Sequence, residues 1–318
     1  MVSFTGANQM RTQLAVAAAL ALLATAAYPQ SNVFSGRATL TVLPAHPEAQ
    51  DASLSASQLD VRLDGKQATV TSLTHLTSSN SPLELVLLID GSVRTSLYGQ
   101  AGDIIGYVKE IPTNTQMAIA YMENGHANLQ GPLSSDPAKV ESGLHMTAGA
   151  PGSNSSPYFC LSDLAKNWPS QNTGARRVVM MITDGVDEYD RRFDPEDPYV
   201  QTAIDDSLRA GLQVYSIYWR DAGRASSSQS ATDAGQNLLL QVTEATGGNS
   251  YWQGDSNPVS LKPYFDDLRR RLRSEYELEL SAPFKGKPLI AQLKLKANAP
   301  NAKVTAPHFV YLSGAAAQ

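Results

Sequence analysis

The chain contains 318 residues, of which 42% are apolar and 17% are charged, and this composition excludes disorder over most of its length. Its formal net charge of −5 at pH 7 argues against nucleic acid or an anionic membrane as the partner, because both attract concentrated positive charge. The single cysteine, Cys160, excludes an intramolecular disulfide bond, so the hydrophobic core must hold the fold together.

An export signal is predicted at the start of the chain. Arg11 precedes an apolar, alanine-rich run over residues 14–27 that only Thr25 interrupts. A membrane anchor is the alternative, but the run is shorter than the roughly 20 apolar residues that a bilayer-spanning helix needs. We therefore expect residues 1–27 to be a cleaved signal peptide and the mature protein to be secreted or periplasmic, without a membrane span.

Residues 28–81 are predicted to form a β-rich segment that ends in a polar linker. Residues 37–43 alternate between apolar and polar side chains, as in a strand with one solvent-facing side. Strands over 59–63 and 68–73 are separated by Asp64-Gly65, a dipeptide that favours a hairpin turn.

Residues 82–274 are predicted to form an α/β domain. The expected strands cover residues 83–89, 116–122, 126–130, 176–183, 212–219 and 250–253, and the expected helices cover residues 97–111, 136–145, 159–168, 199–210, 231–246 and 257–274. Because strands and helices alternate along the chain, we expect a doubly wound, mostly parallel, Rossmann-like sheet.

The C-terminal segment, residues 275–318, returns to a β pattern. Residues 275–280 and 289–296 alternate strictly, which predicts strands with one solvent-facing side. Their natural partners are the strands that precede the α/β domain. The sequence therefore predicts a small antiparallel β-subdomain assembled from both ends of the chain.

Two of the apolar strands in the α/β domain end in polar side chains. One runs into Asp90-Gly91-Ser92, and the other runs into Thr183-Asp184-Gly185. In open α/β sheets the loops at the carboxyl ends of strands form the ligand crevice. We therefore predict a site where these two strand ends lie side by side.

These two motifs, together with the alternation of strands and helices between them, resemble the von Willebrand factor A-type (VWA) domain. The wider order is similar to the related domain abundant in secreted proteins of Acidobacteria. The residues that carry this second resemblance are 59–66, 244–248, 272–278 and Pro283. The resemblance covers about residues 59–283, and it implies a VWA fold.

The resemblance also implies a metal-ion-dependent adhesion site. Such sites hold Mg²⁺ with the motif Asp-x-Ser-x-Ser plus a Thr and an Asp from two other loops, and oxygen ligands of this kind suit Mg²⁺. By resemblance, Asp90 and Ser92 match the first two positions and Asp184 matches the last. The loop expected to carry the Thr offers only Ser153, Ser155 and Ser156. The sequence leaves open which serine takes this place, and Ser155 is our candidate ligand.

Arg94 departs from the family pattern, because it stands where the second serine of the motif is expected. A guanidinium group has no acceptor atom and stays protonated, so it cannot serve as a ligand and would repel a cation. Two interpretations stay open. The site holds Mg²⁺ with a reduced ligand set, or Asp90 pairs with Arg94 or caps backbone amides in a metal-free site.

Other candidate sites are weaker. An acidic run could hold calcium, but its spacing matches no known loop motif and a solvated loop is the favoured interpretation. Its members are Asp187, Glu188, Asp190, Asp194, Glu196 and Asp197. The five histidines are scattered singly, without the spacing of a zinc site.

The sequence, with the resemblance, favours an exported, non-enzymatic binding protein that contacts a protein partner through the carboxyl edge of its sheet. One alternative is a hydrolase that uses Ser92 or Cys160 with a loop histidine, although the flanking residues of Cys160 favour a core position. Another is a purely structural envelope component. The sequence does not identify the partner.

Overall fold

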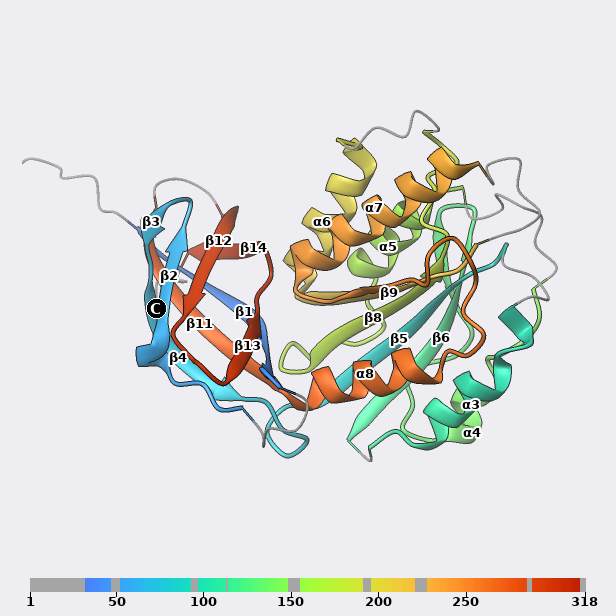
Figure 1. Cartoon of the computed structure of the whole chain (residues 1–318), viewed down its shortest axis with the longest axis horizontal. Helices are drawn as coiled ribbons and strands as arrows, with labels where there is room; N and C mark the ends of the chain where they lie inside the picture. The colour runs from blue at the N-terminus through green and yellow to red at the C-terminus, as the bar shows by residue number, and fades with distance from the viewer. Residues whose placement is uncertain are drawn as a thin grey trace, which may run out of the picture.

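The computed structural model describes residues 32–46, 52–92, 97–112, 114–147, 155–190, 196–220, 228–284 and 288–314. The predicted signal peptide and the predicted site residues Arg94 and Ser153 lie outside the described residues. The described chain forms two lobes, which we call the β lobe (residues 32–75 and 275–314) and the α/β lobe (residues 83–273) (Figure 1). No helix among the described residues is long and apolar enough to cross a membrane.

The α/β lobe is built on a six-stranded sheet. Its strands lie in the order β10 (Ser250–Tyr251), β9 (Leu212–Tyr218), β8 (Arg176–Thr183), β5 (Leu83–Asp90), β6 (Thr115–Glu123) and β7 (His126–Leu129). Neighbouring strands from β10 to β6 are parallel, whereas β7 pairs antiparallel with β6. The expected parallel sheet is therefore present over five strands, with an antiparallel sixth strand at one edge.

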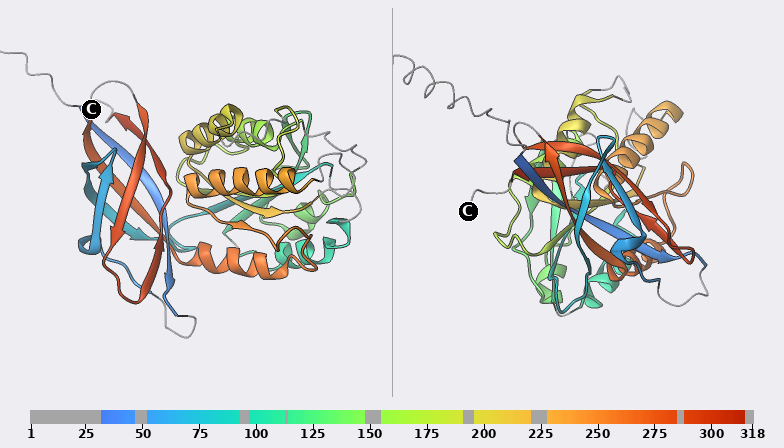
Figure 2. Two further views of the ribbon diagram at one scale, coloured as in Figure 1. Left: turned by 45° about the horizontal axis from the view of Figure 1, so that its top comes forward. Right: turned by 90° about the vertical axis from the view of Figure 1, so that its left-hand side faces the viewer.

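Helices cover both faces of this sheet (Figures 1 and 2). One face carries α3 (Ala101–Lys109), α4 (Pro137–Glu141) and α8 (Lys262–Arg273), and the other carries α5 (Pro157–Lys166), α6 (Pro198–Ala210) and α7 (Gln229–Thr246). Each layer of helices packs on its own hydrophobic cluster. Because both faces are covered, every residue of β5 is buried, which explains its nearly continuous apolar run.

Helices α3 and α8 begin later than the sequence pattern predicts. The start of α8 is set by Asp103 of α3, whose Oδ2 accepts hydrogen bonds from Ser260 Oγ at 2.7 Å and Leu261 N at 2.8 Å. These groups would otherwise be unpaired at a helix N-terminus. Since Asp103 lies 157 positions before Ser260, this cap is invisible to any local sequence pattern. Helix α4 is also shorter than expected and ends at Glu141.

The β lobe contains strands from both ends of the chain. Those that precede the α/β lobe are β1 (Asn32–Pro44), β2 (Leu59–Leu63), β3 (Lys66–Gln67) and β4 (Thr69–His75), and those that follow it are β11 (Glu275–Phe284), β12 (Leu289–Ala297), β13 (Ala302–Thr305) and β14 (Phe309–Gly314). Strand β1 pairs antiparallel with β11 along nearly its whole length, and β2 pairs with β12. This is the pairing between the two ends of the chain that the sequence predicts.

Two details of the β lobe differ from the expectation. The predicted hairpin is wrong in its second strand. Within the hairpin β2 pairs with only the two residues of β3, and β4 pairs with β11 instead. The buried side chains of Val61 and Leu63 lie opposite β12. Packing of these side chains in the core therefore favours β12 as the main partner of β2. Strands β13 and β14 are not predicted from the sequence, because they are short and Pro307 lies between them.

A buried ion pair joins the two lobes. Arg176, the first residue of β8, donates from Nη1 to Oε2 of Glu275, the first residue of β11, at 2.7 Å. The same Nη1 donates to the Leu272 carbonyl oxygen at 2.8 Å. The Glu275 side chain is fully buried and that of Arg176 is 13% exposed. Burial raises the pKa of Glu275 to about 7, and the positive charge of Arg176 opposes this rise.

This raised pKa predicts a pH dependence of stability. A carboxyl whose pKa is higher in the folded state contributes free energy that is fully present below its unfolded pKa of 4.5 and is lost as the pH rises through 7. The free energy of unfolding of wild type minus that of Glu275→Gln should therefore fall by about 1 to 3 kcal/mol between pH ~5 and pH ~8. Urea denaturation across this range measures it.

Glu277→Gln is the matched control, because Glu277 lies two residues further along β11 and pairs with Arg37 at the surface. The free energy of unfolding of wild type minus that of Glu277→Gln should stay nearly constant with pH. A constant difference for Glu275→Gln as well would contradict the raised pKa.

Candidate functional site

The candidate site lies at the carboxyl edge of the α/β sheet, where β5 and β8 end. Strand β5 is central and pairs with β8 on one side and β6 on the other. Asp90 is the last residue of β5 and Thr183 the last of β8, and both side chains are completely buried. Parallel pairing therefore places the two predicted strand ends next to each other.

The Asp90 carboxylate is the centre of this site. Its Oδ1 accepts hydrogen bonds from the Ser92 amide at 2.9 Å and from Ser92 Oγ at 2.6 Å. Its Oδ2 accepts from Thr183 Oγ1 at 2.8 Å. Both carboxylate oxygens are thus hydrogen-bonded, which offsets the cost of burying the group.

Asp184 lies in the turn that follows β8 and is 4% exposed. Its Oδ1 accepts a hydrogen bond from the Val186 amide at 3.0 Å, which fixes the turn. The next residue, Gly185, has φ +69°, and a Cβ there would lie only 2.5 Å from the carbonyl oxygen of Gly235 in α7. The backbone of α7 therefore lies directly against the turn, and only glycine fits at position 185.

The loop that leads into α5 is attached to the same turn. Ser156 is buried and caps α5, since its Oγ accepts from the Tyr158 amide at 3.3 Å. The Tyr158 hydroxyl then donates to the Gly185 carbonyl oxygen at 2.7 Å. Ser155, our candidate ligand, is half-buried in this loop with φ +61°.

The predicted site residues are brought together only in part. Asp90 and Ser92 are hydrogen-bonded to each other, and Asp184 directly follows the Thr183 that binds Asp90. Within the described residues, no hydrogen bond joins Ser155 to any of these three. Arg94 and Ser153 lie outside the described part of the chain.

The side chains present would offer oxygen ligands to a hard cation such as Mg²⁺. Asp90 and Asp184 supply carboxylates, and Ser92, which donates to Asp90, supplies a hydroxyl oxygen. Among the described residues, no three His, Cys, Asp or Glu side chains gather where one ion could bind. A metal here would therefore depend on hydroxyls and water, and the Mg²⁺ site stays a prediction.

Two threonines at the site are not among the candidate ligands predicted from the sequence. Thr183 binds Asp90 directly, and Thr147 donates from Oγ1 to the Gly91 carbonyl oxygen at 2.6 Å. The resemblance to the VWA domain places the family threonine only in the loop before α5. The position of Thr183 at the end of an apolar strand indicates a site residue. Nothing in the sequence around Thr147 indicates its contact with Gly91.

The interpretation of the acidic run as a solvated loop is wrong for two of its members. Asp187 and Asp197 are only 2% and 4% exposed. Asp197 caps α6 by accepting from the Tyr199 amide at 2.7 Å, and Asp187 accepts from two amides of its own turn. Burial raises the pKa of Asp187, and those amides oppose the rise. Asp194 lies outside the described residues.

The two proposed nucleophiles are both inaccessible. Cys160 is completely buried in α5, and burial followed by the nearby charges of Asp90 and Asp163 raises the pKa of its thiol. A raised pKa disfavours the thiolate, which is the reactive form. Ser92 is also completely buried, and its hydroxyl donates to Asp90 rather than to a histidine.

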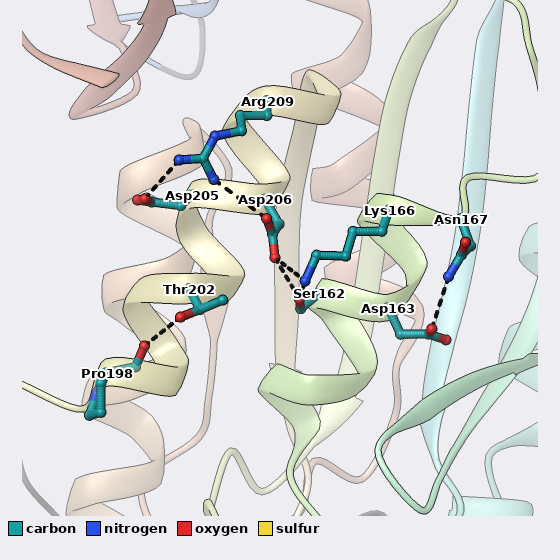
Figure 3. Close-up of polar contacts among 9 residues, drawn as sticks. All are labelled: Ser162, Asp163, Lys166, Asn167, Pro198, Thr202, Asp205, Asp206 and Arg209. Carbon is teal, nitrogen blue, oxygen red and sulfur yellow. Dashed lines mark hydrogen bonds and ion pairs between the residues drawn. The ribbon is translucent and has the colours of Figure 1, made fainter. Parts of the chain in front are cut away.

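A serine and a lysine of α5 also meet beside α6 (Figure 3). Lys166 Nζ lies 3.0 Å from Ser162 Oγ, and Asp206 of α6 accepts from that hydroxyl at 2.6 Å and pairs with Lys166 at 2.9 Å. Burial raises the pKa of Asp206, but the contacts with Ser162 and Lys166 lower it overall. The carboxylate therefore stays charged and accepts the hydroxyl proton of Ser162, so this cluster joins two helices and does not activate the serine.

The chain matches no protein-family model and none of the curated proteins. Among solved structures it is similar to a von Willebrand factor type A protein from Catenulispora acidiphila, with 13% identity, a TM-score of 0.44, and coverage of 89% of this chain and 75% of that chain. It is also similar to an aerotolerance-related membrane protein from Bacteroides fragilis, with 14% identity, a TM-score of 0.40, and coverage of 60% and 98%. A third is the pilus adhesin SpaC from Lactobacillus rhamnosus GG, with 9% identity, a TM-score of 0.43, and coverage of 83% and 48%. At these low values, the strand order and pairing described above remain the basis for the fold.

The burial of Cys160 predicts that its thiol does not react in the folded protein. At pH ~7 iodoacetamide should label native wild type no more than it labels Cys160→Ser, whereas denatured wild type should react fully, because unfolding exposes the thiol and returns its pKa to an ordinary value. Mass spectrometry of the intact protein measures the labelling. Rapid labelling of the native chain would contradict the buried position and revive the hydrolase alternative.

Proposed function

We propose that this protein is an exported, non-enzymatic VWA-type binding protein that recognises a protein partner at the carboxyl edge of its α/β sheet. Export rests on the signal peptide predicted over residues 1–27, and the VWA assignment rests on the sequence motifs and the sheet order. The chemistry of Ser92 and Cys160 gives no support to the hydrolase alternative. The net charge of −5 favours a protein over a nucleic acid as the partner.

The observation that carries this proposal is a set of exposed apolar side chains that follow strands at the carboxyl edge of the α/β sheet. Tyr98 follows β5, Tyr189 follows β8 and Trp252 follows β10, so all three leave carboxyl ends of parallel strands. Met146 immediately precedes Thr147, which is bound to Gly91. These four side chains are 40% to 65% exposed. Tyrosine, tryptophan and methionine are enriched in protein interfaces.

The metal-ion-dependent adhesion site in this proposal is degenerate. Asp90, Ser92, Asp184 and Ser155 are its candidate ligands, and Arg94 occupies the place of a further one. Recognition then relies on the exposed aromatic side chains more than on a metal-bound carboxylate of the partner.

Truncation of two exposed aromatic residues tests the binding surface. Tyr189→Ala with Trp252→Ala should lower capture of the partner at least tenfold, because interface aromatics often contribute ~2 kcal/mol each. The measurement is a pull-down from the envelope fraction of the producing cell, with the mature chain as bait and quantitative mass spectrometry as the readout.

Val33→Ala is the control, because Val33 is 55% exposed on β1 of the other lobe. It should leave capture unchanged, and all variants should melt at the wild-type temperature. Equal capture by wild type and the double variant would refute the carboxyl edge as the binding surface.

The Arg94 substitution tests the metal site. Wild type is expected to show no binding of Mg²⁺ or Mn²⁺ by calorimetry at millimolar metal, because a fixed cation replaces a hydroxyl ligand. Arg94→Ser should create binding, since it removes the repelling charge and restores an oxygen ligand.

The double variant Arg94→Ser with Asp184→Ala should lose whatever binding the single variant gains. Tight binding to wild type would overturn the repulsion argument. Absence of binding to Arg94→Ser would place the defect in the loop that precedes α5, where the family threonine is missing.

A further inference from the structure

An apolar pocket lies at the opposite end of β5 from the candidate site. It has a volume of about 390 Å³ and is enclosed by the end of α3, the last turns of α8 and the linker that enters the lobe. Leu83, the first residue of β5, forms part of its wall, whereas Asp90 lies at the other end of the same strand. The volume falls in the range of about 300 to 1,000 Å³ that is usual for small-molecule sites.

The wall of the pocket is largely hydrophobic. Leu76, Leu83, Tyr107, Ile111 and Leu272 contribute apolar surface. Tyr107 is held in place by stacking on Phe265 of α8, with ring centroids 4.6 Å apart. An aliphatic chain would bury its surface here, and each CH₂ group removed from water would add to the affinity.

The charged groups in the wall all have the same sign. Arg176, Arg269 and Arg273 line the pocket, and none of the described lining residues is an aspartate or a glutamate. This is unexpected in a chain with a net charge of −5. A cationic rim on an apolar pocket fits a ligand with an apolar body and an anionic head.

The three arginines differ in what already neutralises them. Arg269 pairs with Glu110 at 2.9 Å, and Arg176 pairs with Glu275 at 2.7 Å. Arg176 nevertheless retains a buried Nε without a hydrogen-bond partner. Arg273 is exposed, and within the described chain it has no ion-pair partner. One cation at the pocket is therefore uncompensated, which matches a ligand with a single negative charge.

We propose that this pocket binds a monocarboxylate with an unbranched apolar chain, such as a medium-chain fatty acid. The chain lies against Leu83, Ile111 and Leu272, and the carboxylate pairs with Arg273. Arginine suits this role because its planar guanidinium presents two parallel N–H donors to the two oxygens of a carboxylate.

Calorimetry with decanoate, below its micellar concentration, tests the proposal on the full mature chain. Decanoate should bind saturably with one site, and decanol should bind at least tenfold more weakly because it lacks the charge. Arg273→Gln should weaken decanoate binding about tenfold or more, since it removes a charged hydrogen-bond donor to the carboxylate. Arg273 is exposed, so the variant should fold as wild type does.

Two further variants keep the test specific. Arg270→Gln removes an exposed arginine of the same helix that pairs with Asp267 and does not line the pocket, so it should bind decanoate as wild type does. Ile111→Trp should fill the pocket and abolish binding without lowering the melting temperature.

Three results would overturn the proposal. They are equal affinity for decanol and decanoate, equal loss of affinity in Arg270→Gln and Arg273→Gln, or unchanged binding to a folded Ile111→Trp. Absence of any saturable binding of decanoate to wild type would refute it as well.

Discussion

The complete burial of β5 is the constraint on which the rest of the structure depends. All eight of its side chains are covered, because helices pack on both faces of the sheet and a strand lies on either side. In a strand enclosed in this way, only the residues at the two ends can contact a ligand. At the carboxyl end Asp90 anchors the candidate site, and at the amino end Leu83 forms part of the apolar pocket. The two sites are therefore held at a fixed separation by one rigid strand.

The same rigidity extends from Asp90 to the turn after β8. Thr183 links the two strand ends, and the close approach of Gly185 to Gly235 leaves no space for a side chain between this turn and α7. A shift of α7 along its axis would move the Asp184 turn with it, because no flexible side chain separates the two backbones. The position of Asp184 relative to Asp90 thus follows from backbone packing, and the loops around it carry the exposed aromatic residues of the proposed binding surface.

Much of this architecture was predictable from the sequence, because both parts have strong local patterns. The apolar run into Asp90 and the alternation over residues 275–280 each indicated the right kind of strand. The predictions that failed concern features that depend on contacts between residues far apart in the sequence. The start of α8 is fixed by Asp103, the partner of β2 is chosen by core packing, and Asp187 is buried although it lies in an acidic run. At the site, sequence order gave the correct strand ends, but it could not locate Thr147, whose contact with Gly91 exists only in the folded chain.

A protein can retain the framework of a metal site without the metal only if the buried carboxylate has other partners. Burying an ionised carboxylate without partners costs a large amount of free energy. If a bound cation were its only partner, loss of the other metal ligands would also destabilise the fold. Here Asp90 accepts hydrogen bonds from the amide and hydroxyl of Ser92 and from the hydroxyl of Thr183. These bonds give both carboxylate oxygens of Asp90 a partner from the protein itself. Under the proposal that Arg94 replaces a ligand, the edge would lose its metal while the strand ends that form the edge stay in place.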